Sequence, residues 1–332
     1  MMPGPADVHR GPAATVQRYR EGLQRRGHLC ELFGDAGEGS LKQSLEGTIS
    51  RFKPDLVHAH DAWRTGIDLL GLRTPWVVSI TGDDLYSDLA RPGDGALVGE
   101  VLRSAHRVLV PAGSTSRYVE EVVPEAIGKI DVVPRAATAL TPGGTDLRRS
   151  LGIPRSRLLV LLPGGLRPIK GQLRAIGLVD VLRQQGVDAE LVIVGPEQDA
   201  EYAAELRAAA ANEPRIRVLP PLSRERMGAT YLNADIVLNT SHDEGMSLSI
   251  LEAGILGRPV VASDVATNQE LVRHRETGLL FEDAEGLALC VLALCKNRAA
   301  AGALGVRMRE DFKRRFDPDR EIDALLSSYA AA

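Results

Sequence analysis

The chain has 332 residues, 44% of them hydrophobic and 25% charged, with 33 glycines and 19 prolines, which is typical of an ordinary soluble globular protein of two domains. Forty basic and 44 acidic residues leave a net charge of −4, and the sequence has no block of five or six like charges. We therefore do not expect a nucleic-acid-binding protein. No apolar run approaches the roughly 20 residues that span a bilayer, so we expect no transmembrane segment, and peripheral membrane contact stays open.

The first predicted element is a helix from about Thr15 to Arg26, with apolar residues at Val16, Tyr19 and Leu23. A loop over residues 3–14 precedes it. A doubly wound domain normally begins with a buried strand before such a loop, but here only Met1 and Met2 stand there. We therefore expect the first strand of this domain to be missing or truncated, because the native chain starts upstream of Met1 or because the domain lacks that strand.

Short apolar runs alternate with longer segments of helical period through most of the chain, which predicts parallel sheets covered by helices, an α/β fold. The expected strands of the first half are 55–60, 76–81, 107–111 and 130–134. Those of the second half are 158–162, 190–194, 216–219, 235–240, 259–263 and 278–281.

Proline and glycine without apolar period mark residues 135–156 as a connection between domains. We accordingly expect an N-terminal domain over 1–138, a linker over 139–156 and a second domain over 157–316. The remaining residues, 317–332, carry apolar side chains at helical spacing after Asp317 and Pro318, which predicts a terminal amphipathic helix over 319–329.

The segment GGLRPIKG at 164–171 follows the first strand of the second domain. A glycine turn there brings the backbone of Gly164 and Gly165 to the carboxyl edge of the sheet, where α/β proteins bind ligands. Arg167 and Lys170 would add two permanent positive charges suited to a diphosphate. Taken alone, the segment also fits an exposed basic turn without function.

The segment EGMSLSILEAG at 244–254 is predicted to be a loop followed by a helix that Ser247 caps and that Ile250 and Leu251 anchor in the core. The start of such a helix presents free N–H groups to an anion. Glu244 and Glu252 lie eight residues apart, about 12 Å along a helix, comparable to the span from a sugar across its diphosphate to a ribose. Two glutamates on a solvated helix are the plainer alternative.

These segments, with VIVGPE at 192–197 and DIVLNTS at 235–241, resemble the C-terminal half of the retaining family 4 glycosyltransferases of GT-B fold. The nearest resemblance is to the glycosyltransferase 1 domain-containing proteins. It covers residues 158–281 and extends weakly into RGPAAT at 10–15 and SITGDDLY at 79–86. It implies two facing Rossmann-like domains, an acceptor-side domain first and a nucleotide-sugar donor domain second, with the last helix crossing back to the first.

The resemblance also implies roles for particular residues. Glu244 faces the donor sugar and Glu252 holds the ribose hydroxyls, while Arg167 and Lys170 bind the diphosphate. The remaining positions that it implies in the donor site and in the acceptor-side loop are Gly164, Gly165, Leu219, Leu222, Gly245, Met246, Ser247 and Gly11.

One departure from the family concerns the strand end SITGDD, where many members have a histidine near the reacting centre and this chain has Thr81. We expect Thr81 and Asp84 to substitute for it in catalysis. The start of the chain, Met1 to Pro5, resembles the end of the family's first strand.

We expect no metal and no cofactor, because enzymes of this type use arginine and lysine in place of a cation. Asp83 and Asp84 form an acidic pair, yet the resemblance argues against a metal there. His58 and His60 share one face of a strand, but no third zinc ligand follows at a suitable spacing, so we favour hydrogen-bonded or cleft-facing histidines.

The sequence predicts a cytoplasmic retaining glycosyltransferase, since three cysteines and no leader argue against secretion. Cys290 and Cys295 are expected in the core of a helix over 284–297. The donor is expected to be UDP-linked on family grounds, and the acceptor cannot be read from the sequence. Two alternatives stay open: a catalytically silent nucleotide-sugar-binding protein, and a sugar phosphorylase or epimerase on the same fold.

Overall fold

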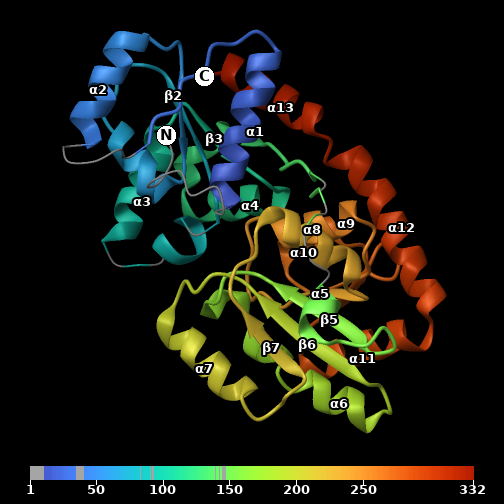
Figure 1. Cartoon of the computed structure of the whole chain (residues 1–332). Helices are drawn as coiled ribbons and strands as arrows, with labels where there is room; N and C mark the ends of the chain where they lie inside the picture. Colours follow the sequence, from blue (N-terminus) through green and yellow to red (C-terminus); the bar gives the residue numbers. More distant parts are fainter. Residues whose placement is uncertain are drawn as a thin grey trace. The chain divides into compact units, whose positions relative to one another are not determined.

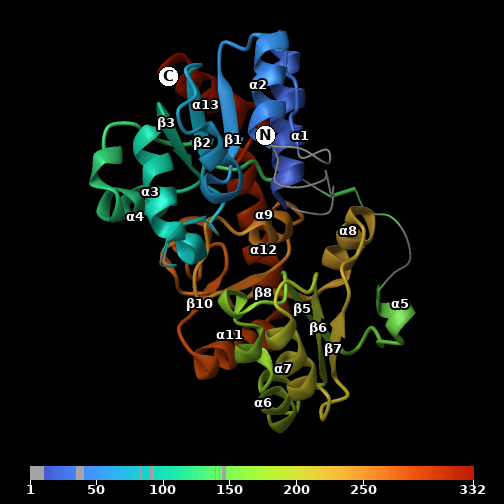
Figure 2. The same cartoon turned by 90° about the vertical axis from the view of Figure 1, so that its left-hand side faces the viewer.

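A computed structural model describes residues 11–34, 41–82, 84–89, 91, 93–138, 140–141, 143 and 147–332 (Figures 1 and 2). The chain divides into two compact units. The first unit comprises Met1–Ala136 with Phe316–Ala332, and the second comprises Ala137–Arg315.

The described part of the first unit is built on a parallel sheet of four strands in the order β1-β2-β3-β4. The strands coincide with the apolar runs of the first half: β1 (Val57–His60), β2 (Trp76–Ser79), β3 (Arg107–Val110) and β4 (Ile130–Val132). Alternation along β2 divides the core, because Val77 packs with α1 (Gly11–Arg25) and α13 (Pro318–Ala330), whereas Val78 packs on the opposite face with α3 (Asp94–Ser104). The other helices and turns are α2 (Leu41–Phe52), α4 (Gly113–Val122), η1 (Ala62–Gly66), η2 (Ile67–Leu69), η3 (Asp84–Asp88) and η4 (Pro124–Ala126).

Helix α13, at the end of the chain, lies along α1 in the first unit (Figure 1). Its Glu321 has a fully buried side chain and binds Arg18 of α1 through two hydrogen bonds of 2.6 and 2.8 Å. At Gly22 the helices approach so closely that an added Cβ would lie 2.5 Å from Ile322. The paired charge and the glycine contact together fix the register of the two helices.

Helix α1 starts at Gly11, four residues before the Thr15 that the apolar pattern predicted. Pro12 does not oppose this start, because proline is tolerated in the first turn of a helix, where its missing N–H has no partner to lose. Gly11 is thus the first described residue of this helix, and its part in an acceptor-side loop stays a prediction. The predictions for Met1 to Pro5 and for Asp83 fall outside the described residues.

The second unit holds a parallel sheet of six strands in the order β10-β9-β8-β5-β6-β7. The strands are β5 (Leu158–Pro163), β6 (Ala189–Val194), β7 (Ile216–Leu219), β8 (Ile236–Asn239), β9 (Val260–Ser263) and β10 (Leu279–Phe281). The chain builds from β5 outward to β7 and then restarts at β8 on the other side of β5. The strand order therefore reverses between β5 and β8, and ligands of open α/β sheets bind at the carboxyl ends of such a pair.

One face of this sheet carries the main core of the second unit, formed with α6, α7 and α11. Cys290 and Cys295 of α11 pack against this core, as predicted. The helices and turns of the unit are α5 (Leu147–Leu151), α6 (Leu178–Gln184), α7 (Ala200–Ala210), α8 (Arg224–Asn233), α9 (Leu248–Ile255), α10 (Ala266–Leu271), α11 (Ala284–Lys296), α12 (Arg298–Arg315), η5 (Pro168–Lys170) and η6 (Gln172–Ala175).

The stretch 139–156, which we expected to be a linker, is in its described part attached to the second unit. Arg148 of α5 is buried, donates to the carbonyls of Pro154 and Arg157 and forms a 2.6 Å ion pair with Asp235. The apolar pattern did not predict this short helix, because the buried side chain of Arg148 holds it in place and arginine is usually exposed.

Within the described residues, no single helix has the length and apolar content to cross a bilayer, while one bent pair, 284–296 with 298–330, passes by length and composition alone.

Candidate functional site

The loops that follow β5 and β8 meet at the point where the strand order reverses. Thr240 donates its hydroxyl to the carbonyl of Lys170 over 2.8 Å, and the backbone N–H of His242 donates to the carbonyl of Ile169, also over 2.8 Å. Gly171 has φ +58°, and an added Cβ there would lie 2.4 Å from the carbonyl oxygen of Thr240. Only glycine permits both this conformation and this approach, so the two loops form one surface.

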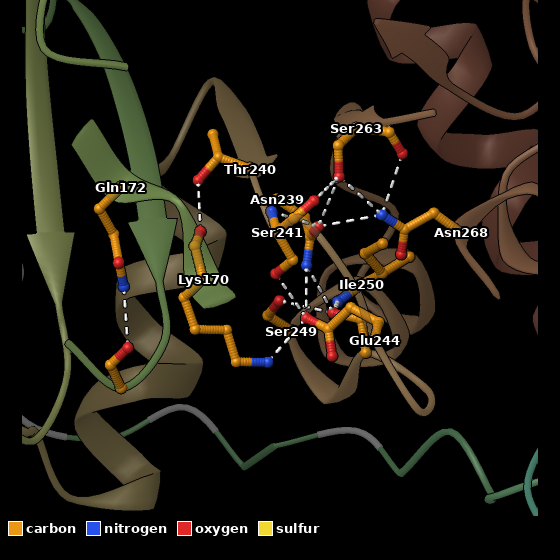
Figure 3. A network of polar contacts seen from close by, with 12 residues as sticks. Lys170, Gln172, Asn239, Thr240, Ser241, Glu244, Ser249, Ile250, Ser263 and Asn268 are labelled. Atoms are coloured by element: carbon orange, nitrogen blue, oxygen red, sulfur yellow. Dashed lines mark hydrogen bonds and ion pairs between the residues drawn. The ribbon is translucent and has the colours of Figure 1, made fainter. Parts of the chain in front are cut away.

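Lys170 and Glu244, both predicted to act in catalysis, are brought together by these loops (Figure 3). Lys170 Nζ lies 2.7 Å from Glu244 Oε1, and the Glu244 side chain is 7% exposed. Burial acts to raise the pKa of Glu244, but the charge and hydrogen bond of Lys170, with hydrogen bonds from Ser241 and Asn239, hold that pKa below its ordinary value. Glu244 is therefore a buried carboxylate that stays charged.

Asn239, the last residue of β8, organises the surroundings of Glu244. Its amide donates to Glu244 Oε1 over 3.1 Å and to Ser247 Oγ over 3.0 Å. Its carbonyl oxygen accepts from Asn268 over 3.0 Å, and Asn268 in turn donates to the carbonyl of Ser263 (Figure 3). These residues are buried and joined by hydrogen bonds, although Asn268 Oδ1 has no partner among the described residues, and the network fixes the Glu244 carboxylate in one orientation.

Helix α9 begins beside this network. Ser247 is its N-cap, with the side chain accepting from the N–H of Ile250, and Ile250 and Leu251 are buried, as predicted. Gly245 and Met246 are buried in the loop that leads into the helix. The amino end of α9 carries partial positive charge, and its N-cap follows the fixed carboxylate of Glu244 by three residues, so this edge can bind an anion next to a polar, hydrogen-bonding group.

Glu252, on α9, faces a partner that the sequence did not reveal. The hydroxyl of Tyr231 in α8 donates to Glu252 Oε2 over 2.9 Å. Burial raises the pKa of Glu252, and the hydrogen bond from Tyr231 opposes that change. The half-buried carboxylate is thus held in place and has an oxygen left for other donors.

The other predicted donor-site residues line the same carboxyl edge of the sheet. Arg167 is half-buried directly before η5, three residues from Lys170. Gly165 approaches the β6 loop so closely that an added Cβ would lie 2.1 Å from Gln198 Oε1. Gly164 donates to the carbonyl of Val194 at the end of β6. Leu219 ends β7, and Leu222 follows in the loop, both half-buried.

Thr81 and Asp84, the predicted substitutes for a histidine, lie at the carboxyl edge of the first unit's sheet. Asp84 is completely buried, and its carboxylate accepts from the backbone N–H groups of Ala62, Thr81 and Gly82 at 2.8–3.2 Å. Because both oxygens accept backbone hydrogen bonds, Asp84 fixes the shape of the loop around Thr81. This geometry does not present Asp84 to a substrate. Thr81, which is half-buried, lies at the surface of that loop.

Asp61 is a neighbour of Asp84 that sequence reasoning missed. Its Oδ2 lies 3.3 Å from the Thr81 hydroxyl, which is also 3.4 Å from Asp84 Oδ1. Asp61 adopts φ +94°, caps η1 by accepting from the N–H of Arg64, and is 3% exposed. Burial, together with the charge of Asp61, raises the pKa of Asp84 to about 7.

A small cavity of about 20 Å³, enough for one water molecule, opens beside Thr81 within the first unit. Tyr19, His60 and Arg135 line it. Arg135 donates to the carbonyl of Thr81 at 3.4 Å and, within the described residues, forms no ion pair; burial lowers its pKa.

The histidine pair on β1 lies next to this cavity. The ring of His58 stacks on His60 with centroids 4.0 Å apart, and its nitrogens lie 2.6 Å from the Tyr329 hydroxyl and 2.7 Å from the Ser79 hydroxyl. His58 is therefore hydrogen-bonded, as predicted, while His60 lines the cavity. Over the part of the chain that the structure covers, no three His, Cys, Asp or Glu side chains are grouped as metal ligands.

Two family models match the chain, "Glycosyl transferase 4-like domain" over residues 40–136 and "Glycosyl transferases group 1" over residues 157–297. The second contains the loops after β5 and β8, with Arg167, Lys170, Glu244 and Glu252.

Curated relatives agree with these models. The chain is 26% identical to glycosyltransferase 1 domain-containing protein 1 of Xenopus tropicalis, over 82% of this chain and 81% of that protein. It is 29% identical to D-inositol 3-phosphate glycosyltransferase of Nocardia farcinica, over 84% of this chain and 66% of the relative. The enzyme of the same name from Xylanimonas cellulosilytica is 33% identical, over 60% of this chain and 48% of the relative. The chain thus spans about half to two thirds of the length of these two enzymes.

Solved structures show the fold. Sucrose-phosphate synthase of Thermosynechococcus elongatus superposes with a TM-score of 0.83 at 21% identity, covering 97% of this chain and 93% of that one. Anabaena HepE, solved in complex with UDP-glucose, gives a TM-score of 0.75 at 21% identity and covers 98% and 97%. The two parallel sheets therefore have the GT-B fold. The chain belongs to the group 1, family 4-like glycosyltransferases, a family that uses nucleotide-sugar donors.

Proposed function

We propose that this protein is a retaining glycosyltransferase that moves a sugar from a nucleoside-diphosphate sugar to an acceptor hydroxyl without a bound metal. The observation that carries the proposal is the pair of Lys170 and Glu244, 2.7 Å apart where the strand order of the second unit reverses. A cation and a charged carboxylate so placed suit the two ends of the bond that breaks.

The diphosphate would bind Lys170, Arg167 and the amino end of α9. As the bond from the anomeric carbon to the phosphate oxygen breaks, its electron pair stays on the diphosphate, and these groups stabilise the growing negative charge. The Glu244 carboxylate would hold the sugar as positive charge develops on it. The acceptor hydroxyl would attack the anomeric carbon from the same face and pass its proton to the departing phosphate oxygen, so that bonds and charge balance.

Glu252 would hold the ribose hydroxyls. The free oxygen of its carboxylate can accept a hydrogen bond while Tyr231 occupies the other, and the residue stands eight positions after Glu244 on the same loop and helix. The complexes of HepE with UDP and with UDP-glucose favour a uridine donor for this chain as well.

For the acceptor, we propose a polyol that carries an anionic group. Several relatives are named D-inositol 3-phosphate glycosyltransferases. In this chain, Arg135 lies beside Thr81 at the carboxyl edge of the first sheet and forms no ion pair among the described residues, so its charge suits a phosphate group bound at that edge. An Arg135→Gln variant should therefore raise the KM for D-inositol 3-phosphate at least tenfold and leave the donor Kd unchanged. An equal change for phosphate-free inositol would contradict this role.

A thermal-unfolding screen with UDP-, GDP-, ADP- and dTDP-sugars in EDTA tests the donor site. A ligand at 100 times its Kd adds about 2.7 kcal/mol to the free energy of unfolding, so the true donor should raise the Tm. The increase should disappear in Glu252→Ala and persist in Glu276→Ala, an exposed glutamate away from the site. If no nucleotide sugar raises the Tm of a cooperatively melting wild type, the assignment of the donor site is wrong.

The identified donor then allows the chemistry to be tested. NMR of the sugar first released or transferred should show the anomeric configuration of the donor, and EDTA should not lower the rate. Inversion of configuration would contradict the retaining assignment, and recovery by added divalent metal would contradict metal independence. Binding of the donor without hydrolysis or transfer would support the catalytically silent alternative. The cytoplasmic location stays a prediction.

A further inference from the structure

A second cavity lies in the second unit at the edge of the sheet opposite to the proposed donor site. It has a volume of about 360 Å³, within the range of small-molecule sites. Leu158 and Ile236, which line it, are the first residues of β5 and β8, whereas Lys170 and Glu244 follow the carboxyl ends of the same strands. The two sites share no residue and lie at opposite ends of parallel strands.

Three arginines line this cavity: Arg258, Arg298 and Arg309. Arg258 donates one hydrogen bond, from Nη1 to the carbonyl of Leu232 over 3.1 Å, and its Nε is buried without a partner. Over the described residues, none of the three forms an ion pair. Burial lowers the pKa of Arg258, Asp235 raises it, and the charge of Arg309 lowers it, so Arg258 and Arg309 lie close enough to repel.

Asp235 is the acidic residue in the lining, and it is already engaged elsewhere. Its Oδ2 accepts from Arg148 over 2.6 Å and from the backbone N–H of Leu159 over 2.7 Å. One carboxylate shared with Arg148 cannot neutralise three further guanidinium groups. The cavity therefore carries excess positive charge next to an unsatisfied buried donor.

The backbone around the cavity adds to this preference for an anion. The first turn of α12, which starts at Arg298 and reaches the cavity at Ala301, brings the positive end of an 18-residue helix, where Asn297 Oδ1 accepts from the N–H of Ala300. The carboxyl end of α9 is closed by its own chain, since Arg258 N donates to the carbonyl of Ala253 and Gly257, at φ +68°, donates to Gly254. The negative end of that helix is thus partly satisfied.

The rest of the wall is apolar and is formed mainly by Leu158, Ile236, Leu256, Leu294 and Val306. We propose that the cavity binds an organic phosphate, with Arg258 and Arg309 on the phosphate oxygens and the organic part against the apolar wall. Guanidinium groups match the geometry of phosphate, and a ligand without an apolar part would leave that wall wet. Helix α9 joins this cavity, through Leu256 and Gly257, to the loop that holds Glu244.

Titration calorimetry with phenyl phosphate at low salt tests the proposal on the full chain. We expect saturable binding by the wild type with one equivalent, and inorganic phosphate should bind at least tenfold more weakly. Arg309→Gln, a change at an exposed position, should weaken phenyl phosphate binding at least tenfold, and Arg258→Gln should do the same in protein that melts cooperatively. Arg149→Gln, which removes the same charge from an exposed site outside the cavity, should leave binding unchanged.

Two results would overturn the proposal: no binding of phenyl phosphate by wild type, or equal binding by Arg309→Gln and wild type. Displacement of phenyl phosphate by UDP would also overturn it, because the probe would then occupy the donor site. Failure of the donor screen would not affect this test, since its readout does not involve a nucleotide sugar. Vesicles with phosphatidic acid, compared with soluble glycerol phosphate, distinguish a lipid headgroup from a free phosphate ester as the source of the ligand.

Discussion

A carboxylate is buried at the carboxyl edge of each sheet. Its neighbour is a cation in the second unit and another carboxylate in the first. In the second unit, Glu244 lies 2.7 Å from Lys170 and its pKa is held below the ordinary value. In the first unit, Asp84 lies beside Asp61, and burial with that like charge raises its pKa to about 7. The same chemical group is thus a permanent charge in one place and a proton-binding group in the other.

The comparison separates two uses of a buried acid. Glu244 has a cation, an amide and a hydroxyl around it, which suits a group that must remain negative next to a sugar. Asp84 receives three backbone N–H groups, so its first effect is on the shape of the loop at Thr81. We therefore expect changes around Glu244 to affect catalysis most and changes around Asp84 to affect stability and its pH dependence.

The largest effect is expected when the cation of the second unit is removed. Lys170→Ala should lower kcat about 100-fold or more, because the leaving diphosphate loses a preorganised charge. Lys170→Arg should keep part of the activity. Steady-state kinetics with the identified donor, next to calorimetry of donor binding, measures both quantities. An equal loss in kcat and in donor affinity would show that Lys170 only binds the ground state.

A smaller effect is expected from Asn239→Ala, which leaves the buried oxygen of Glu244 and the amide of Asn268 with fewer partners. The free energy of unfolding should fall by about 1–3 kcal/mol in urea denaturation. Asn212→Ala, at an exposed position, should change it by less than about 0.5 kcal/mol. Equal values for the two variants would mean that the network adds nothing to stability.

The buried pair of Asp61 and Asp84 predicts that the free energy of unfolding changes with pH by about 1 kcal/mol or more. Since the pKa of Asp84 is raised, the folded state binds more protons than the unfolded state between about pH 4 and 7, and this group makes stability fall as pH rises. Asp61→Asn keeps the cap on η1 and suits a positive φ, but removes the like charge. The fall should be smaller in this variant.

Urea denaturation of wild type and Asp61→Asn at pH 5 and pH 7 measures this effect. Burial lowers the pKa of His58 to about 3, and lowers that of His60, so the histidines make stability rise with pH over part of the same range. Their contribution cancels in the difference between the two proteins. The same pH dependence in both would refute coupling of Asp61 and Asp84.

The smallest effect concerns Tyr231→Phe, which removes the hydrogen bond to Glu252 and nothing else at the site. Donor Kd should rise about two- to tenfold, the equivalent of about 0.5–1.5 kcal/mol. Tyr118→Phe makes the same change on α4 of the first unit, and should leave the donor Kd unchanged. Calorimetry of both variants decides whether Glu252 depends on Tyr231.

The ten strands of the described residues could all be predicted from the sequence, because each is a short apolar run in a sheet covered by helices. The N-cap at Ser247 was equally local, since one hydroxyl three residues before Ile250 is enough. It could also be predicted that the segments 164–171 and 244–254 lie at one edge of the sheet, because they follow β5 and β8, whose carboxyl ends share that edge.

The pairing of those residues could not be predicted. Lys170 and Glu244 are 74 positions apart, and nothing local says that the loops after β5 and β8 touch. The sequence does mark Asn239, because a polar amide ends the apolar run IVLN. No comparable pattern marks Tyr231. Asp84 was predicted to act in catalysis because the sequence does not show that its side chain is buried.

We infer that Lys170 keeps Glu244 charged at a site for a nucleoside diphosphate. The most direct test is ¹³C NMR of the Glu244 carboxyl, assigned with Glu244→Gln and titrated with acid in wild type and Lys170→Met, with and without UDP. We predict a pKa below the ordinary glutamate value in wild type, a higher one in Lys170→Met, and a shift of the resonance when UDP binds. An identical titration in both proteins, with no response to UDP, would contradict the account.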